Sequence, residues 1–286
     1  MNPRAAHLAL DTALGTLDIV APQLELARLA IEPALSALLG AARTAQQVDL
    51  GGRAAWIKAS HLSGSAAWRY GLRRRLLLRA PPRVRELENL DWLLERLFRA
   101  PQPLAAGSIL RGLRMRFQFL LMDRLDDVRP FDAALETASK AERAELLDEL
   151  AREVARMHAL RFVHRDLYLR NVLVRPPHSG PGDPRRLAFV DAWRGGPFHL
   201  WRGPAFDLGC LMLDGAGLLD AAEQRTFVRL YLSERAVQGR PADASALLAA
   251  AARARKSQLE RVRREPHRWR RAEPPAPEWD ARALSD

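Results

Sequence analysis

Residues 164–171 read HRDLYLRN, and the apolar segment LAFVD (187–191) follows and ends in Asp191. An aspartate, an asparagine five positions later and a second aspartate after a strand are the groups that hold a hydroxyl, Mg²⁺ and ATP in line during phosphoryl transfer. In this pattern Asp166 accepts the proton of the acceptor hydroxyl, while Asn171 and Asp191 supply the oxygen ligands that Mg²⁺ prefers. The stretch therefore predicts a catalytic Asp166 beside a Mg²⁺ site formed by Asn171 and Asp191.

A β-hairpin is predicted around this motif. The β-branched run NVLV (171–174) and the segment LAFVD flank a loop rich in proline and glycine, PPHSGPGDP (176–184). The alternative is that Asp166, Asn171 and Asp191 are ordinary loop residues that cap backbone groups. Their spacing and the flanking hairpin favour the metal site over that alternative.

Three further polar residues near the motif have structural roles in this interpretation. His164 is expected to brace the backbone of the loop, and His158 to pack at the end of a helix. Asp207, in the segment FDLGCL (206–211), is expected to accept N–H bonds from the loop. It would then support the site without taking part in the chemistry.

Lys58 ends the apolar strand AAWIK (54–58) and is one of only three lysines among 45 basic residues. A lysine at this place in a kinase-like lobe reaches the α- and β-phosphates and is held by a glutamate on the next helix. A surface lysine with its charge in water is the alternative, but the scarcity of lysine in this chain favours the functional role. Glu86 lies on the apolar stripe of a predicted helix over 84–98, whereas Glu88 lies on its charged face. Glu86 is therefore the predicted partner of Lys58 in nucleotide binding.

The composition is that of a globular protein, because 48% of the 286 residues are apolar. The single cysteine, Cys210, excludes an intrachain disulfide and favours a reducing, cytoplasmic setting. Acidic residues and prolines interrupt the apolar N-terminal stretches well before about 18 residues accumulate, so neither a membrane span nor a signal peptide is expected. The formal charge of +11, from 45 basic and 34 acidic residues, favours anionic partners.

Four parts are expected along the chain. Residues 1–35 predict a helical extension, residues 36–125 a small lobe rich in strands, residues 126–265 a helical lobe, and residues 266–286 a loosely packed proline-rich tail. In the first lobe, QQVDLGGRAAWIK (46–58) predicts two strands joined by a glycine turn, and residues 116–125 predict another strand. In the second, a long helix is expected to begin near Ser139, with Glu142 forming a capping box. The predicted fold class is α+β, with the two lobes of a protein-kinase-like fold.

Two segments concentrate positive charge. WRYGLRRRLLLRAPPRVR (68–85) holds seven arginines and no acidic residue. Its interleaved aromatic and aliphatic residues suit the surface of an anionic membrane or glycolipid as well as they suit a solvated helix face. A solvated helix face is the favoured interpretation of the second run, 253–271. Binding of nucleic acid is not favoured, because no nucleic-acid module accompanies the charge.

At these residues the chain resembles the lipopolysaccharide kinase family that phosphorylates Kdo or heptose in the inner core, a branch of the protein-kinase-like fold. The resemblance spans roughly residues 36–235 and rests on AAWIKASHLSGSAAW (54–68), VRELENLDWLLERLFRAPQPLAAG (84–107), VHRDLYLRNVLV (163–174), and FVDAWRGG followed by RGPAFDLGCL (189–211). It implies ATP, Mg²⁺ and a sugar hydroxyl of the lipopolysaccharide core or a related anionic glycan as acceptor. It also implies work at the cytoplasmic face of the inner membrane of a Gram-negative cell, with peripheral contact to that membrane.

The chain departs from the protein-kinase pattern in three places. No GxGxxG loop precedes Lys58, DAW stands in place of DFG, and Tyr168 stands where protein kinases place a lysine. Arg170 or Arg194 could supply the charge that this lysine brings to the γ-phosphate.

Two other functions remain open at the level of the sequence. A small-molecule kinase of the aminoglycoside or choline type binds cationic acceptors in acidic pockets. The strongly basic composition of this chain argues against that function. A pseudokinase that binds anionic surfaces is suggested by the missing glycine-rich loop and by Tyr168. The segment between Asp191 and Asp207 contains no Ser, Thr or Tyr. That composition favours a small or glycan acceptor and activity that needs no phosphorylation of the segment.

Overall fold

The computed structural model describes residues 5–176, 186–197, 203–215 and 217–264. The chain divides into two compact units, Met1–Asp126 and Asp127–Asp286. The division falls one residue after the boundary expected between the two lobes, and the N-terminal segment is part of the first unit rather than a separate extension. The proline-rich tail (266–286) and most of the expected loop 176–184 lie outside the described residues.

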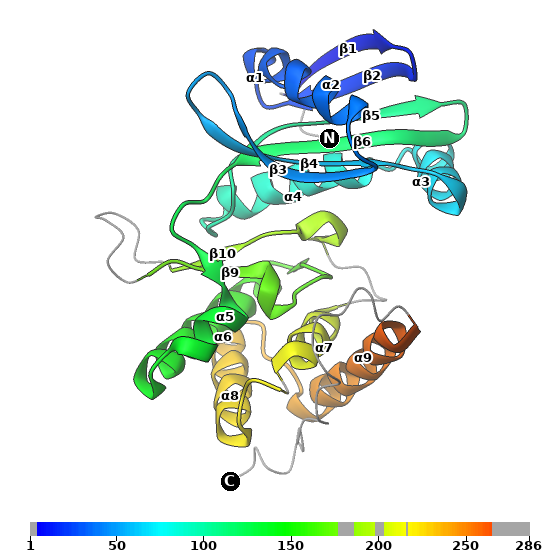
Figure 1. Ribbon diagram of the computed structural model, residues 1–286. Helices are drawn as coiled ribbons and strands as arrows, with labels where there is room; N and C mark the ends of the chain where they lie inside the picture. The colour runs from blue at the N-terminus through cyan, green and yellow to red at the C-terminus, as the bar shows by residue number, and fades with distance from the viewer. Residues whose placement is uncertain (1–4, 177–185, 198–202, 216, 265–286) are drawn as a thin grey trace. The chain divides into compact units, whose positions relative to one another are not determined.

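The first unit is built on a six-stranded antiparallel sheet with the strand order β1-β2-β5-β6-β4-β3 (Figure 1). The strands are β1 (Ala6–Thr12), β2 (Gly15–Ala21), β3 (Arg43–Asp49), β4 (Ala54–His61), β5 (Pro103–Arg111) and β6 (Arg114–Asp123). The expected hairpin is β3–β4, and it turns through Gly51 and Gly52, both with positive φ. β6 is the strand expected at 116–125, and it pairs with β4 and β5.

The prediction that residues 1–35 form a helical extension is wrong for its first part. β1 and β2 form a hairpin, and helices begin only at α1 (Leu24–Leu29) and α2 (Ile31–Leu39). Leucine and alanine favour helices locally, but here β2 adds to the sheet beside β5, with Leu17 opposite Ile109. Burial of Leu17 and Ile19 in the sheet outweighs the weak local preference.

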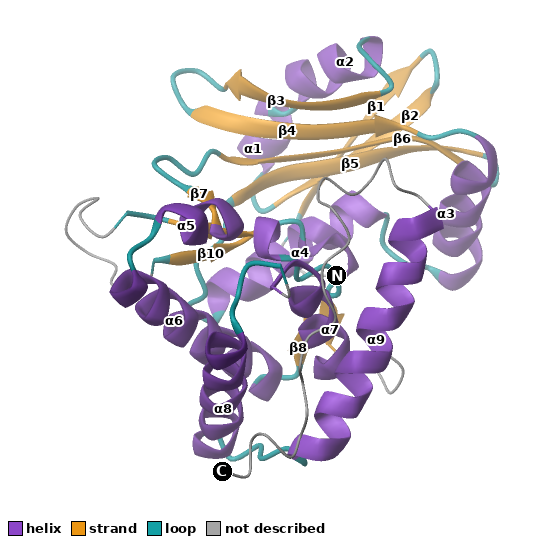
Figure 2. Ribbon diagram, turned by 60° about the horizontal axis from the view of Figure 1, so that its bottom comes forward, coloured by secondary structure: helices purple, strands orange, loops and turns teal. Residues whose placement is uncertain are grey.

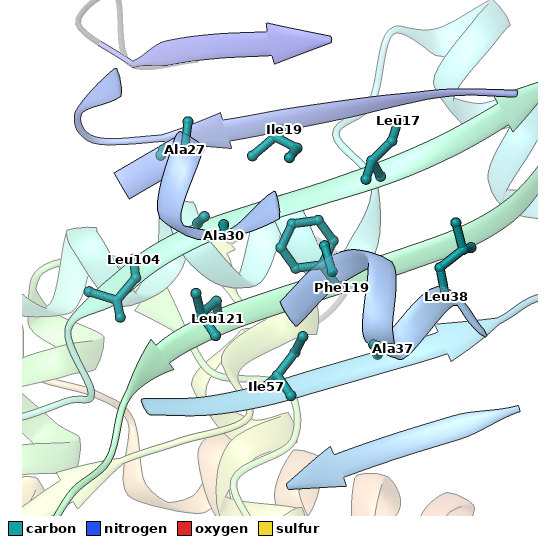
Figure 3. Close-up of a cluster of buried hydrophobic side chains, with 14 of the residues drawn as sticks. Leu17, Ile19, Ala27, Ala30, Ala37, Leu38, Ile57, Leu104, Phe119 and Leu121 are labelled. Atoms are coloured by element: carbon teal, nitrogen blue, oxygen red, sulfur yellow. The ribbon is translucent and has the colours of Figure 1, made fainter. Parts of the chain in front are cut away.

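Helices cover both faces of this sheet. On one face, α1 and α2 pack on a buried cluster drawn from β2, β4, β5 and β6, in which Ile57, Phe119 and Leu121 meet Ala30 and Ala37 (Figure 3). Because successive side chains along a strand point to opposite faces, the neighbour of Ile57 on β4, Lys58, faces the other side. That side carries α3 (Gly64–Leu77) and α4 (Pro82–Glu95), the helix expected at 84–98.

The second unit is mostly helical (Figure 2). Its helices are α5 (Phe131–Thr137), α6 (Lys140–Ala159), α7 (Pro204–Gly215), α8 (Ala221–Val237) and α9 (Ala244–Arg264), and its short strands are β7 (Arg129–Pro130), β8 (Phe162–Val163), β9 (Val172–Val174), β10 (Leu187–Phe189) and β11 (Gly196–Pro197). The long helix α6 begins after Ser139, whose hydroxyl accepts the N–H of Glu142 at 3.3 Å, as expected for a capping residue. α6 packs on α8, and α7 packs on α9. Within the ranges that the structure describes, no helix combines the length and the apolar character needed to cross a bilayer.

Candidate active site

The loop between β8 and β9 carries the motif HRDLYLRN in the second unit. It ends in a short 3-10 turn, Leu169–Asn171, and continues into β9, which pairs with β10 as the predicted hairpin. The side-chain nitrogen of Asn171 donates to the backbone oxygen of Asp166 at 2.8 Å. Since the amide nitrogen is used within the loop, the Asn171 carbonyl oxygen Oδ1 is the end of the side chain suited to a metal ion.

The hairpin brings Asp191 to the same end of the loop. The N–H of Val190 donates to the backbone oxygen of Asn171 at 3.0 Å, so the next residue, Asp191, lies beside the asparagine. Asp191 has a left-handed backbone conformation, φ 63° and ψ 32°. Few residues other than glycine adopt this conformation, although aspartate is among those that tolerate it, and it marks a turn that the surrounding structure fixes.

Two carboxylates and a carboxamide thus converge in one unit. Burial raises the pKa of the Asp166 carboxyl above its ordinary value, and the charges of Arg194 and His164 oppose that shift. The negative charge of Asp191 adds to the increase, so the two carboxyl groups interact electrostatically. Hard oxygen ligands in this arrangement fit a divalent cation such as Mg²⁺.

Asp207, at the start of α7, holds the backbone of the motif loop. Its side chain is completely buried, and its two oxygens accept the N–H groups of His164 and Arg165, each at 2.6 Å. Arg165 has φ 61°, an unfavourable value for a long side chain that these bonds help to maintain. The predicted supporting role of Asp207 is confirmed.

Two histidines complete this support. The ring nitrogen Nε2 of His164 lies 2.9 Å from the backbone oxygen of Val190, so it braces the strand that leads to Asp191. His158 is buried at the end of α6, with Nδ1 2.8 Å from the Tyr231 hydroxyl and Nε2 3.2 Å from Asp207. Burial lowers the pKa of His158 despite the neighbouring carboxylate. A neutral ring with its proton on Nε2 satisfies both partners.

Tyr168 does not replace the missing lysine of the protein-kinase pattern. Its ring is buried in a cluster with Phe206, Cys210 and Leu213, and its hydroxyl donates to Gln258 of α9 at 3.3 Å. Burial raises the pKa of the Tyr168 hydroxyl, which keeps it neutral. The tyrosine therefore ties the loop to α9 instead of presenting a charge to phosphate.

Lys58 and Glu86 meet in the first unit as predicted. Lys58 Nζ lies 3.2 Å from Glu86 Oε1, and the glutamate side chain is completely buried whereas the lysine is slightly exposed. Glu88 is not the partner. A second cation, Arg83, one turn earlier on α4, binds Glu86 Oε2 at 2.5 Å. The buried carboxylate thus holds two cations, an arrangement that fixes the side chain of Lys58. The strand does not end at Lys58 as expected, because β4 continues to His61 beside β6.

All five residues predicted for the site therefore fall into two groups. Asp166, Asn171 and Asp191 gather in the second unit, and Lys58 with Glu86 gathers in the first. The sequence analysis missed Arg83, although its spacing of three residues from Glu86 on a helix was a usable signal. It also missed Gln258, for which the sequence carries no signal, because the contact joins residues ninety positions apart.

An antiparallel sheet carrying a buried lysine–glutamate pair, followed by a helical unit with this loop and hairpin, defines a two-lobed protein-kinase-like fold. The solved structure of WaaP in complex with acyl carrier protein has a similar fold: it is 20% identical, with a TM-score of 0.50 over 76% of this chain and 85% of that chain. The family model for the lipopolysaccharide kinase (Kdo/WaaP) family matches residues 45–198, which is more than half of the chain. The chain therefore belongs to this family. No curated protein matches the chain. Membership supports a role as a sugar kinase.

Proposed function

We propose that this chain transfers the γ-phosphoryl group of ATP to a sugar hydroxyl of the lipopolysaccharide inner core, on Kdo or heptose, or of a related glycan. The observation that carries the proposal is the convergence of Asp166, Asn171 and Asp191 at one end of a hairpin, in a member of a lipopolysaccharide kinase family. In the reaction, the acceptor oxygen forms a bond to the γ-phosphorus, and the bond from that phosphorus to the β-phosphate oxygen breaks to release ADP.

Asp166 is the proposed base. Its carboxylate orients the acceptor hydroxyl and takes its proton as the new bond forms. Asn171 would hold Mg²⁺ through Oδ1, and Asp191 through its carboxylate. The metal ion supplies the positive charge that offsets the charge of the phosphate oxygens.

Lys58 is the proposed ligand of the α- and β-phosphates, with Glu86 and Arg83 keeping its position. Against the burial that raises the pKa of Asp166, the charges of Arg194 and Arg170 both lower it, and we assign to one of these two arginines the cation that Tyr168 does not supply. Both arginines also stack on aromatic rings, Arg194 on Trp193 at 4.3 Å and Arg170 on Tyr168 at 4.1 Å, which orients their guanidinium groups.

An anionic glycan is the proposed acceptor class. A chain with a formal charge of +11 attracts a phosphorylated or carboxylated sugar and repels the cationic acceptors of aminoglycoside-type kinases. Since the phosphoryl donor is ATP, we place the reaction on the cytoplasmic side of the inner membrane.

The direct test is phosphoryl transfer from radiolabelled ATP with Mg²⁺. Label should pass to isolated lipopolysaccharide, and not to aminoglycosides or to protein. Truncated cores that end in Kdo, compared with cores that carry heptose, identify the acceptor sugar. Transfer to an aminoglycoside, or no transfer to any acceptor with ATP bound, would overturn the proposal in favour of a small-molecule kinase or a pseudokinase.

Two variants test the assigned roles. Asp166→Ala should abolish turnover while ATP binding persists, because it removes the base but no metal ligand. Asp191→Ala should abolish the thermal shift produced by ATP with Mg²⁺. Asp243→Asn, at an exposed aspartate of the second unit, is the matched control. Normal turnover in Asp166→Ala would refute its role, and an unaltered thermal shift in Asp191→Ala would refute metal binding there.

A further inference from the structure

Four large apolar side chains are exposed within eleven residues at α3 and the turn that follows it. The exposed fractions are 40% for Trp68, 68% for Leu76, 59% for Leu77 and 81% for Leu78. Single exposed leucines are common on protein surfaces, but three consecutive ones, Leu76 to Leu78, are typical of a surface that another molecule covers.

The packing of α3 explains why these side chains point outward. The helix lies on the end of the sheet next to the β5–β6 turn through its small residues, Ala67 and Gly71 (Figure 2). A Cβ at Gly71 would collide with the backbone of Leu113, so only glycine permits this close approach. Arg114 stacks on the Trp68 ring at 4.5 Å and fixes the indole at the surface.

The three leucines form a projecting tip. Successive helical residues are separated by about 100° around the axis, so Leu76 and Leu77 point in different directions. Leu78 is the C-cap of α3 and has a left-handed backbone conformation, φ 48°. The N–H of Arg79 donates to the backbone oxygen of Arg73 and so caps the end of the helix. A tip that is apolar on several sides fits a fluid apolar medium better than it fits one groove of a folded partner.

Positive charge surrounds this tip. Arg69, Arg73, Arg75 and Arg79 are exposed, and residues 68–85 contain no acidic side chain. Burial lowers the pKa of Arg85, and the charges of Arg79 and Arg73 lower it further, whereas Glu88 acts in the opposite direction. Arg73 and Arg79 therefore both interact electrostatically with Arg85.

We propose that α3 and its C-terminal turn dock the chain on the surface of an anionic phospholipid bilayer. Leu76, Leu77 and Leu78 enter the boundary between headgroups and acyl chains, and the surrounding arginines bind lipid phosphates. Two signals, apolar insertion and charge, together give stable binding where either alone gives weak binding. The proposal uses none of the residues assigned to phosphoryl transfer and does not depend on that activity.

The test is sedimentation of the full chain with vesicles of phosphatidylglycerol and phosphatidylcholine, compared with vesicles of phosphatidylcholine alone. The wild-type chain should bind the anionic vesicles and dissociate as salt is added. Arg73→Gln, Arg75→Gln and Arg79→Gln together should weaken binding by about 150-fold, since each arginine near such a surface contributes about fivefold. Leu76→Ser, Leu77→Ser and Leu78→Asn together should also remove the protein from the pellet.

Matched controls separate the site from general charge and general apolarity. Leu39→Ser changes an exposed leucine at the end of α2, and Arg225→Gln with Arg229→Gln and Arg253→Gln removes three exposed arginines from the second unit. Both controls should bind vesicles like the wild-type chain, and all variants should keep the wild-type circular dichroism and thermal transition.

Two results would overturn the proposal. One is a wild-type chain that does not sediment with anionic vesicles. The other is a leucine variant that sediments as well as the wild-type chain, which would show that Leu76, Leu77 and Leu78 do not enter the bilayer.

Discussion

Replacement of Asp207 by asparagine tests how the motif loop is held in place. In the wild-type chain its carboxylate accepts the N–H groups of His164 and Arg165, both at 2.6 Å, in a fully buried position. In Asp207→Asn one oxygen remains, but the new amide nitrogen faces one of the two donors, so at least one bond is lost. A hydrogen bond to a charged group contributes about 1.5–3 kcal/mol, and an unpaired buried N–H costs about 1–3 kcal/mol. We therefore expect the free energy of local opening to fall by about 3 kcal/mol.

Hydrogen exchange followed by mass spectrometry measures this effect directly. A loss of about 3 kcal/mol corresponds to exchange about 100-fold faster at the amides of His164 and Arg165. The transfer rate should fall as well, because Asp166 follows directly in the chain. Asp243→Asn is the control, since Asp243 also accepts a backbone N–H, from Ala246 at 3.0 Å, but at an exposed helix start where asparagine caps equally well. Wild-type exchange in Asp207→Asn would show that this carboxylate does not hold the loop.

Three further substitutions probe neighbouring features. Tyr168→Phe should keep transfer within about tenfold, at a cost of about 1 kcal/mol in stability for the lost bond to Gln258, and loss of all transfer would mean that the hydroxyl takes part in the chemistry. Glu86→Gln should lower stability by about 3 kcal/mol and weaken ATP binding in a titration, because two cations lose their counter-charge; Glu88→Gln should change neither, and equal effects of the two would contradict the assignment. The pKa of Asp91 is raised by burial, and further by neighbouring carboxylates, to about 6, above the 3.8 of an unfolded chain. The protonated form thus favours folding, and this contribution is present below pH 3.8 and lost as the pH rises through 6. Asp91→Asn should then stabilise the chain at pH 7 by about 1 kcal/mol, discounted for a half-exposed group, and not at pH 3.5; an equal denaturation midpoint for both chains at pH 7 would refute the shift.

The parts of the fold that the sequence predicts are those with local signals. The β9–β10 hairpin has β-branched runs on either side of a proline- and glycine-rich loop, so it needs no information from elsewhere in the chain. The pairing of Lys58 with Glu86 is predictable for a similar reason. A helical stripe distinguishes a buried glutamate from an exposed one, and Glu86 is the one that is buried.

The parts that the sequence does not predict depend on distant partners. β5 is buried along most of its length, so its residues show no alternation between apolar and polar, and it begins with Pro103, which argues against a strand. The hairpin of β1 and β2 becomes favourable only because β5 offers it an edge. The assignment of β1 and β2 as strands therefore depends on β5, for which the sequence gives no local signal.

Arg165 is used within the second unit in a way that supports the expectation of activity without phosphorylation. Arg165 of the motif loop donates to the backbone oxygens of Arg194 and Pro197, at 3.3 and 3.2 Å. Both carbonyls belong to the segment after Asp191, and β11 within that segment pairs with β8 immediately before the loop. A guanidinium group that could bind a phosphorylated side chain is instead used by the backbone of the segment itself. Because 191–207 also contains no hydroxyl side chain, we expect the loop around Asp166 to be held without phosphorylation of this segment, and the activity to be set by substrate and by location.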